Sequence, residues 1–268
     1  MPRGMECGSA GDRNREDYLG GWVLGRKGYK CRRLLGKGAF SAVYCVEDET
    51  DGRVYACKIS RDARLLEREA QVMAALDHPL FTTCFAFWRE AGLGFLLSEY
   101  VAGCSLEEML ARRGRFSARQ TVHMGIALAE GLAYLHGRPE KYLFRDVKPA
   151  NIMVGQAGGV KLVDFGCVCS LEEGIFSRAG TPGFAAPEQL EGGRQLTPAC
   201  DVYGLGRTME EMLGGDRTRK SVGWPERKEK SRGLRRILEA CRQEDVSRRI
   251  REMEQLLSAL EQWEKRTQ

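Results

Sequence analysis

Two aspartates lie eighteen residues apart, each within a short motif whose residue types could carry out phosphoryl transfer. Asp146 is followed by a lysine two residues later and an asparagine five residues later, and Asp164 begins an Asp-Phe-Gly tripeptide. In phosphoryl transfer, one carboxylate orients a hydroxyl nucleophile and a second holds Mg²⁺ on the nucleotide. A nearby lysine offsets the charge of the transferring group. The spacing therefore indicates a site for transfer of a phosphoryl group from a nucleotide.

The residues before these motifs are predicted to form mainly strands. Strands are expected over residues 29–35, 42–47, 54–59, 85–88 and 95–97. Between the third and fourth of them, residues 63–76 change to a helical period, with apolar residues three and four positions apart. The sequence Asp77-His78-Pro79 ends that helix, because the residue before a proline disfavours helical geometry.

Beyond Gly103 the pattern is mainly helical. A capping box at Ser105 and Glu108 begins this part. Further helices are expected over residues 117–136, 201–213, 234–241 and 250–263. A small strand-rich half followed by a larger helical half predicts an α+β protein with two lobes.

A glycine-rich turn between the first two predicted strands could bind phosphate. Gly36 and Gly38 let backbone N–H groups approach phosphate oxygens, but Ser41 stands where a third glycine would complete the GxGxxG pattern. Alone, this segment is as well explained by an ordinary hairpin. Lys58, on a later predicted strand and twenty residues after Gly38, strengthens the phosphate-binding interpretation. Without the other motifs, Lys58 would be taken as a surface lysine.

These motifs occur in an order that resembles the eukaryotic-type protein kinase family, in its Ser/Thr branch. The resemblance covers residues 29–263 and includes the segments 144–151, 164–166 and 180–188. It implies a protein-kinase-like fold, with a small β-rich N-lobe containing one long helix and a larger, mainly helical C-lobe. The residues of these motifs are similar to those of bacterial members of the family. Since the chain stops after the kinase segments, a soluble, minimal member is expected.

The resemblance also implies domain limits. They are a flexible N-terminal extension over residues 1–28, an N-lobe over 29–98, a hinge over 99–103 and a C-lobe over 104–268.

Five residues take catalytic roles by the same resemblance, namely Asp146, Lys148, Lys58, Glu69 and Thr181. Asp146 would orient the substrate hydroxyl, and Lys148 would lie beside the transferring phosphoryl group. A buried lysine needs an anionic partner. Glu67 and Glu69 are both candidates for Lys58, and counting back from His78-Pro79 favours Glu69.

The implied cofactors are ATP and Mg²⁺, with Mn²⁺ as an alternative cation. Asn151 and Asp164 would be the metal ligands, because hard oxygen atoms suit a hard cation. The ATP-binding residues would be Leu35, Gly36, Gly38, Val43, Ala56, Lys58, Glu99, Val101 and Met153. Ser98 would control access to a back pocket, and its small side chain predicts that bulky groups are tolerated there.

The segment 180–188 resembles the end of a kinase activation segment. Thr181 would hydrogen-bond Lys148 and Asp146, and together with Lys148 it favours Ser and Thr over Tyr as acceptors. Ser177 is the candidate site of an activating autophosphorylation, with Ser170 and Thr181 as competitors and an unmodified loop equally compatible. The resemblance further pairs Glu188 with Arg249 and makes Asp201 a brace of the catalytic loop, both in architectural roles.

Three rival functions fit part of the sequence. A scaffold that lost catalysis would lack at least one catalytic residue, but all are present. A small-molecule kinase would lack the Gly-Thr-Pro and Ala-Pro-Glu segment, which builds a platform for a peptide. The basic stretch over residues 217–236 could bind nucleic acid, but acidic residues interleave it and no aromatic platform accompanies it.

Composition limits the remaining choices. The 268 residues are 43% hydrophobic with a net charge of +5, which is ordinary for a soluble enzyme. Ten cysteines show no zinc-ligand spacing, and no run approaches the roughly 20 apolar residues of a membrane span. A polar N-terminus predicts no secretory signal, so a cytoplasmic location is expected. Expected partners are protein substrates and the chain itself, without nucleic acid; the substrates, the upstream signal and the oligomeric state stay open.

Overall fold

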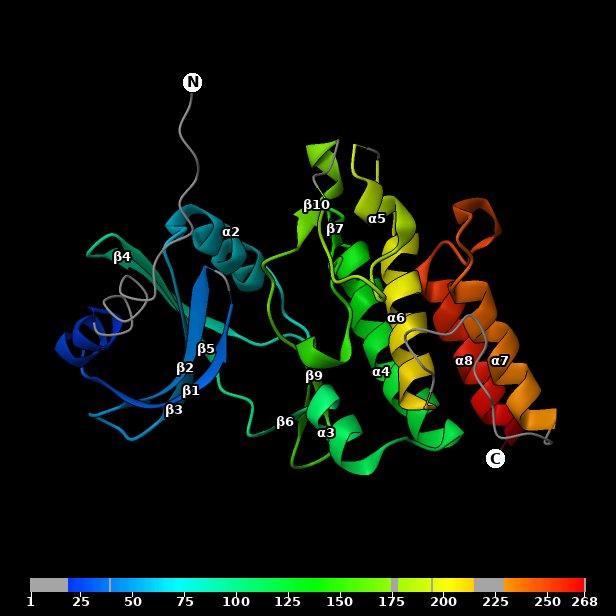
Figure 1. Cartoon of the computed structure of the whole chain (residues 1–268), viewed down its shortest axis with the longest axis horizontal. Helices are drawn as coiled ribbons and strands as arrows, with labels where there is room; N and C mark the ends of the chain where they lie inside the picture. The colour runs from blue at the N-terminus through cyan, green and yellow to red at the C-terminus, as the bar shows by residue number, and fades with distance from the viewer. Residues whose placement is uncertain (1–18, 39, 175–177, 194, 215–228, 268) are drawn as a thin grey trace, which may run out of the picture. The chain divides into compact units, whose positions relative to one another are not determined.

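The computed structural model describes residues 19–38, 40–174, 178–193, 195–214 and 229–267, which divide into two compact units (Figure 1). The first unit holds the described residues up to Ala75 together with Thr83–Tyr100. The second holds Leu76–Thr82 and the chain from Val101 onward. The segment Leu76–Thr82 thus belongs with the second unit, whereas the sequence alone puts all of residues 29–98 in one lobe.

The first unit is built on a five-stranded antiparallel sheet with the strand order β1-β2-β3-β5-β4. Its strands are β1 (Tyr29–Lys37), β2 (Ser41–Asp48), β3 (Val54–Ser60), β4 (Cys84–Glu90) and β5 (Leu93–Glu99). Successive side chains of a strand point to opposite faces. Along β3, Cys57 and Ile59 are therefore buried on one face, while Lys58 points to the other.

Helix α2 (Ala63–Ala74) packs against β4 and β5. The Asp62 side chain accepts the Leu65 N–H at 2.9 Å, which satisfies one of the free amides at the helix start. Gly94 of β5 allows the close approach, because a Cβ there would lie 2.9 Å from the Ala63 Cα. The helix ends before His78-Pro79, as the sequence predicts.

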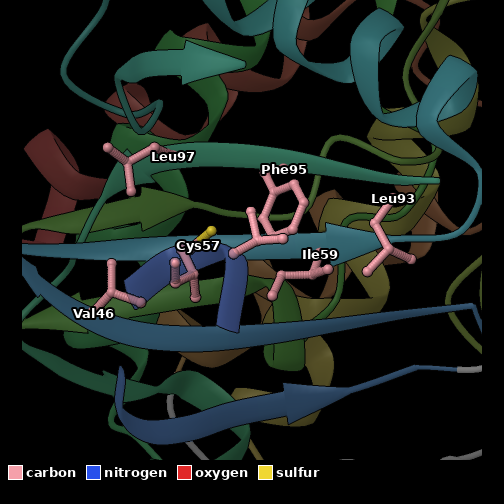
Figure 2. Close-up of a cluster of buried hydrophobic side chains, with 8 residues drawn as sticks. Val46, Cys57, Ile59, Leu93, Phe95 and Leu97 are labelled. Carbon is pink, nitrogen blue, oxygen red and sulfur yellow. The ribbon is translucent and has the colours of Figure 1, made fainter. Parts of the chain in front are cut away.

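Residues 19–26 are helical and pack on the same sheet through fully buried Val23 and Leu24. These two side chains join a hydrophobic cluster with Val46, Cys57, Ile59, Leu93, Phe95 and Leu97, six of which are labelled in Figure 2. Burial of a Val or Leu side chain contributes about 1.5–3 kcal/mol. The prediction of a flexible extension over residues 1–28 is therefore wrong for these positions, since this packing stabilises a helix in a glycine-rich segment.

The second unit is mainly helical. Its helices are α3 (Leu106–Arg113), α4 (Ala118–His136), α5 (Pro187–Glu191), α6 (Ala199–Met212), α7 (Glu229–Cys241) and α8 (Met253–Thr267). Helix α4 packs against α6 and α8, and α6 also packs against α7. Glycines allow these close contacts: a Cβ at Gly125 would lie 2.6 Å from the Met209 side chain, and one at Gly206 would lie 2.5 Å from the Cys241 Cβ.

Short strands of the second unit were too brief for a periodic signal in the sequence. They are β6 (Gly103–Ser105), β7 (Tyr142–Leu143), β8 (Ile152–Gly155), β9 (Val160–Leu162) and β10 (Cys169–Ser170). Strands β6, β8 and β9 form one small antiparallel sheet, and β7 pairs with β10. The pairing of Ile152 with Leu162 brings the chain before β8 and the chain after β9 to the same end of that sheet.

Together, these elements confirm the expected α+β architecture, with an antiparallel sheet unit and a helical unit. The capping box predicted at Ser105 is also confirmed: its Oγ accepts the Glu108 N–H at 3.1 Å, and Glu108 accepts the Ser105 N–H at 3.2 Å. Within the part of the chain that the structure describes, no helix combines the length and the apolar character needed to cross a membrane.

Candidate active site

In the first unit, Lys58 and Glu69 form an ion pair between β3 and α2. The Lys58 Nζ atom lies 3.0 and 2.8 Å from the two carboxylate oxygens of Glu69. The side chains are only 16% and 4% exposed, so each charge depends on the other for compensation. Glu67, the alternative partner, instead binds Arg89 on an exposed face of the same helix.

The glycine-rich turn connects β1 to β2 in the same unit. The Gly38 N–H donates to the Ser41 carbonyl at 2.8 Å and closes the turn, while Ala39 lies outside the described residues. Phe40 at its tip is 74% exposed. Phe40 thus presents an apolar side chain at the surface of the turn.

The remaining first-unit candidates lie on neighbouring strands. Val43 of β2 pairs in register with Lys58, and Ala56 of β3 pairs with Ser98 of β5. Leu35 lies on β1, and Glu99 ends β5 with its N–H donating to the Thr83 carbonyl at 2.9 Å. The sheet therefore places these candidates on adjacent strands, with Leu35 at an irregular position of β1, while Val101 and Met153 belong to the second unit.

In the second unit, Asp146, Lys148 and Thr181 form a closed triangle of polar contacts. Lys148 Nζ lies 2.7 Å from Asp146 Oδ2 and donates to Thr181 Oγ1 at 2.6 Å. The Thr181 hydroxyl in turn donates to Asp146 Oδ1 at 2.8 Å. A carboxylate and an ammonium group are thereby fixed next to each other by a residue that lies 35 positions further along the chain.

Asn151 extends this network towards Asp164. Its Nδ2 donates to the Asp146 carbonyl at 3.0 Å and to Asp146 Oδ2 at 2.9 Å, which leaves Oδ1 as the atom that can ligate a cation. The Val163 N–H donates to the Asn151 carbonyl at 2.9 Å, so the exposed Asp164 follows directly at the same end of the β8–β9 sheet.

These two oxygen donors fit Mg²⁺. That cation usually takes one or two protein ligands and completes its octahedron with water and substrate phosphates. Consistent with such a sparse donor set, no group of three or more His, Cys, Asp or Glu side chains arranged for a metal is found among the residues that the structure places.

Two residues of the site have unusual backbone geometry. Arg145 and Asp164 have φ values of 68° and 66°, in the left-handed region that side-chain-bearing residues rarely adopt. Such strain persists only where surrounding contacts enforce it. Arg145 directly precedes Asp146, and Asp164 begins the Asp-Phe-Gly tripeptide. Strained conformations cluster at active sites of this kind.

Beneath the catalytic loop, buried groups fix its backbone. Asp201 of α6 accepts the N–H groups of Phe144 at 2.8 Å and Arg145 at 2.7 Å, which confirms its predicted bracing contact. Its Oδ2 also lies 2.8 Å from His136 Nε2, a contact that sequence reasoning left unassigned. Phe144 packs edge-on against Phe165, with ring centroids 5.7 Å apart.

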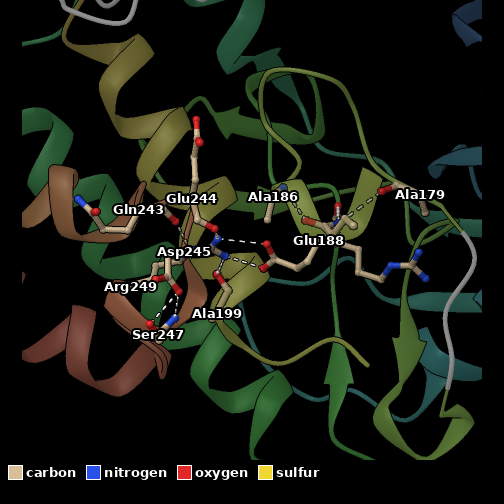
Figure 3. A network of polar contacts seen from close by, with 11 residues as sticks. Ala179, Ala186, Glu188, Ala199, Gln243, Glu244, Asp245, Ser247 and Arg249 are labelled. Atoms are coloured by element: carbon tan, nitrogen blue, oxygen red, sulfur yellow. Dashed lines mark hydrogen bonds and ion pairs between the residues drawn. The ribbon is translucent and has the colours of Figure 1, made fainter. Parts of the chain in front are cut away.

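The predicted pair of Glu188 and Arg249 is also confirmed (Figure 3). Arg249 donates to both carboxylate oxygens, at 2.6 and 3.1 Å, and its side chain is fully buried. Further donations go to the carbonyls of Ala199, Gln243 and Glu244 at 3.1, 2.8 and 3.2 Å. All three guanidinium nitrogens are therefore used, and they hold α5 and the start of α6 against the turn that contains Gln243 and Glu244.

Gln189 is a residue of this site that sequence reasoning missed. Its buried side chain donates to the Arg145 carbonyl at 2.7 Å and accepts the Ala186 N–H at 3.0 Å. A Cβ at Gly180 would meet the Gln189 amide at 3.2 Å and the Arg145 carbonyl at 3.0 Å, so the segment passes very close to the catalytic loop. The only signal in the sequence is that Gln189 stands three residues after Ala186, at a capping-box position.

Some candidates lie outside the described residues. Ser177 is one of them, and most of the basic stretch over residues 217–236 is another. Among the competitors of Ser177, Ser170 donates to the Glu140 carbonyl at 2.6 Å.

Burial, followed by the charges of Asp146 and Asp164, raises the pKa of the Cys167 thiol, which argues against a reactive thiolate there.

Comparison with known proteins identifies the family. A family model described as "Protein kinase domain" matches residues 29–263. The chain belongs to this family. Its five-stranded antiparallel sheet followed by a helical unit fits the two-lobed α+β fold of protein kinases.

Three relatives show the kind of protein that the chain resembles. The chain is 29% identical over 209 residues to serine/threonine-protein kinase PrkC of Bacillus subtilis, covering 74% of this chain and 32% of that protein. It is 35% identical over 195 residues to RAC-beta serine/threonine-protein kinase A of Xenopus laevis, covering 68% and 39%. It is 31% identical over 189 residues to putative serine/threonine-protein kinase PRKY of Homo sapiens, covering 68% and 67%. The chain thus spans about a third of the length of PrkC.

Proposed function

We propose that this chain is an ATP-dependent protein serine/threonine kinase, which transfers the γ-phosphate of ATP to Ser and Thr hydroxyls of protein substrates. The observation that carries the proposal is the Asp146–Lys148–Thr181 triangle, joined by Asn151. It supplies a carboxylate fixed by neighbours and a cation beside it, which are the groups that phosphoryl transfer requires from a protein.

In the proposed mechanism, Asp146 orients the acceptor hydroxyl and takes its proton. A positioned base of this kind contributes about 10²–10⁴-fold to the rate. Lys148 offsets negative charge on the transferring group, and Thr181 keeps the lysine and the carboxylate in place. Asn151 and Asp164 would hold Mg²⁺, or Mn²⁺ as an alternative, which neutralises charge on the phosphates when bound.

The proposed nucleotide site includes residues of the first unit. Lys58, oriented by Glu69, contacts the α- and β-phosphates, and the turn at Gly36 and Gly38 covers the phosphates with backbone amides. In the first unit, Leu35, Val43, Ala56 and Glu99 would contribute to the adenine site.

The preference for Ser and Thr acceptors rests on Lys148 and Thr181 and agrees with the names of the relatives. We also propose that the chain phosphorylates its own activation segment at Ser177. This residue stands where many members of the family carry an activating phosphate. Mass spectrometry of protein incubated with Mg-ATP tests this. Phosphate within residues 167–181 that is missing from a Ser177→Ala variant supports it, and a segment that stays unmodified overturns it.

The test of the proposed function is phosphate transfer from labelled Mg-ATP to a generic protein acceptor. We expect label on Ser and Thr, identified by phosphoamino acid analysis, with wild type and almost none with Asp146→Asn. A matched control is Asp245→Asn, an aspartate outside the triangle that caps a short helical turn and should leave transfer unchanged. Wild-type protein that labels no acceptor would overturn the proposal.

A further inference from the structure

Three charged side chains form a network on one side of α6, apart from the catalytic triangle. Arg207 Nη1 donates to Glu210 Oε2 at 2.5 Å, and Arg242, directly after α7, lies 3.2 Å from Glu210 Oε1. The Glu210 side chain is only 6% exposed. One buried carboxylate therefore orients two guanidinium groups, and it keeps a partner if either one is removed.

Arg207 also reaches the segment that follows Thr181. Its Nε atom donates to the Gly183 carbonyl at 2.9 Å. Gly183 has a φ of 92°, a conformation that glycine adopts without strain, and it has no side chain with which to anchor itself. The contact from Arg207 is thus a fixed point for the backbone at this position.

The same helix holds the catalytic loop. Asp201 accepts two of its N–H groups, and Thr208 Oγ1 donates to the Val147 carbonyl at 3.2 Å. Gly204 lies between Asp201 and Thr208 in the helix and lets the catalytic loop and the segment after Thr181 approach it. A Cβ at Gly204 would lie 3.2 Å from the Val147 Cβ and 3.6 Å from the Phe184 carbonyl. Helix α6 therefore sets the distance between the catalytic loop and the segment 180–188.

From this geometry we propose that Arg207 is a positioning residue for the peptide substrate. It fixes the Gly183 backbone, and through it the surface on which the residues next to the acceptor Ser or Thr lie. The proposal rests on the proposed kinase function, in which the segment 180–188 is the peptide platform. Arg207 touches neither nucleotide nor acceptor in this account, so its loss changes peptide affinity and leaves nucleotide affinity unchanged.

Steady-state kinetics on the full chain test the proposal, with a synthetic serine peptide and Mg-ATP varied in turn. For Arg207→Met we expect the KM for peptide to rise about tenfold, the size of one charge-assisted hydrogen bond, with the KM for Mg-ATP unchanged. Arg207→Lys should recover part of the loss, because a lysine still pairs with Glu210 but lacks the fork that reaches Gly183. Arg235→Met, which removes an exposed pair with Glu239, is the matched control.

Hydrogen–deuterium exchange gives a readout that does not depend on activity. In Arg207→Met, exchange should rise in residues 180–186 and stay unchanged at Lys58–Glu69. An unchanged peptide KM in an active protein, or equal losses for peptide and nucleotide, would overturn the positioning role. If wild type phosphorylates no peptide, the kinase function fails instead, and unchanged exchange at 180–186 would separately refute the contact.

Discussion

The charged clusters of the two units are held in different ways. In the first unit, Lys58 and Glu69 pair directly between one strand and one helix. In the second, Asp146 contacts Lys148, Thr181 and Asn151, and its loop is held from below by Asp201. The second arrangement has several fixed points from distant parts of the chain, so it should tolerate the loss of one contact without losing its geometry.

The two units also differ in the contacts that support each charged cluster. The first unit rests on a hydrophobic cluster that includes the helix at residues 19–26. The second unit also has an apolar cluster, at Leu143, Cys169, Ala186, Leu196 and Cys200, and adds buried polar contacts such as Glu188–Arg249. Buried polar contacts are costly to break, because the remaining group stays charged or unpaired. Substitutions in the two units should therefore differ in how much they lower the free energy of unfolding and in which segment they affect.

The largest effect on stability is expected from Arg249→Met. It leaves the Glu188 carboxylate and three carbonyls without their buried donor, which should lower the free energy of unfolding by about 3–5 kcal/mol. Arg235→Met is the control, since an exposed pair contributes only about 0.2–1 kcal/mol. Urea unfolding of both variants measures the difference, and equal losses would show that the buried pair carries no special weight.

A smaller effect is expected from Gln189→Leu. The change removes the donor to the Arg145 carbonyl and the acceptor of the Ala186 N–H, at a cost of about 1–3 kcal/mol. Hydrogen exchange should rise around residues 179–189 and not in the first unit. Gln262→Leu, at an exposed position of α8, is the matched control. Protection of residues 179–189 equal to wild type would mean that Gln189 does not hold this segment.

Val23→Ala tests the foundation of the first unit. Loss of two buried methyl groups from the hydrophobic cluster should lower stability by about 1–2 kcal/mol. The same substitution at Val54, which is 39% exposed on β3, should cost much less. Thermal unfolding measures both variants. If they are equally stable, the helix at residues 19–26 does not contribute to the sheet.

The smallest effect at neutral pH is that of the Cys241 thiol, which acts only at alkaline pH. Burial raises the pKa of the Cys241 thiol from an ordinary 9.0 to about 12. Between these values the unfolded chain releases the thiol proton and the folded chain keeps it, so this contribution is complete below pH 9 and is lost as the pH rises. Its slope is about 1.4 kcal/mol per pH unit. Cys241→Ala should unfold with a shallower pH dependence from pH 9 to 10.5, and identical slopes would contradict the burial.

Much of this could be predicted from the sequence, and the exceptions have physical reasons. The Asp146, Asn151 and Asp164 motifs are local, so their spacing determines where they lie once the small strands form. Arg249 was predictable because its partner segment is distinctive. Gln189 and Arg207 were not, because each acts on a backbone carbonyl that no sequence pattern marks.

The helix at residues 19–26 escaped prediction for another reason. Its glycines lower helix propensity by about 1 kcal/mol each, and only packing against the sheet compensates for this loss. Local propensity is then a poor guide, since the stabilising contacts come from β2, β3 and β5.

The most direct test of the kinase account separates nucleotide binding from transfer in the Asp146→Asn variant. Equilibrium binding of Mg-ATP and single-turnover transfer to a Ser/Thr acceptor would be measured on the same preparation as wild type. The account predicts that Mg-ATP affinity is retained while the transfer rate falls by about 10²–10⁴-fold. Transfer by Asp146→Asn at the wild-type rate would contradict it, because the carboxylate at the centre of the triangle would then have no part in the chemistry.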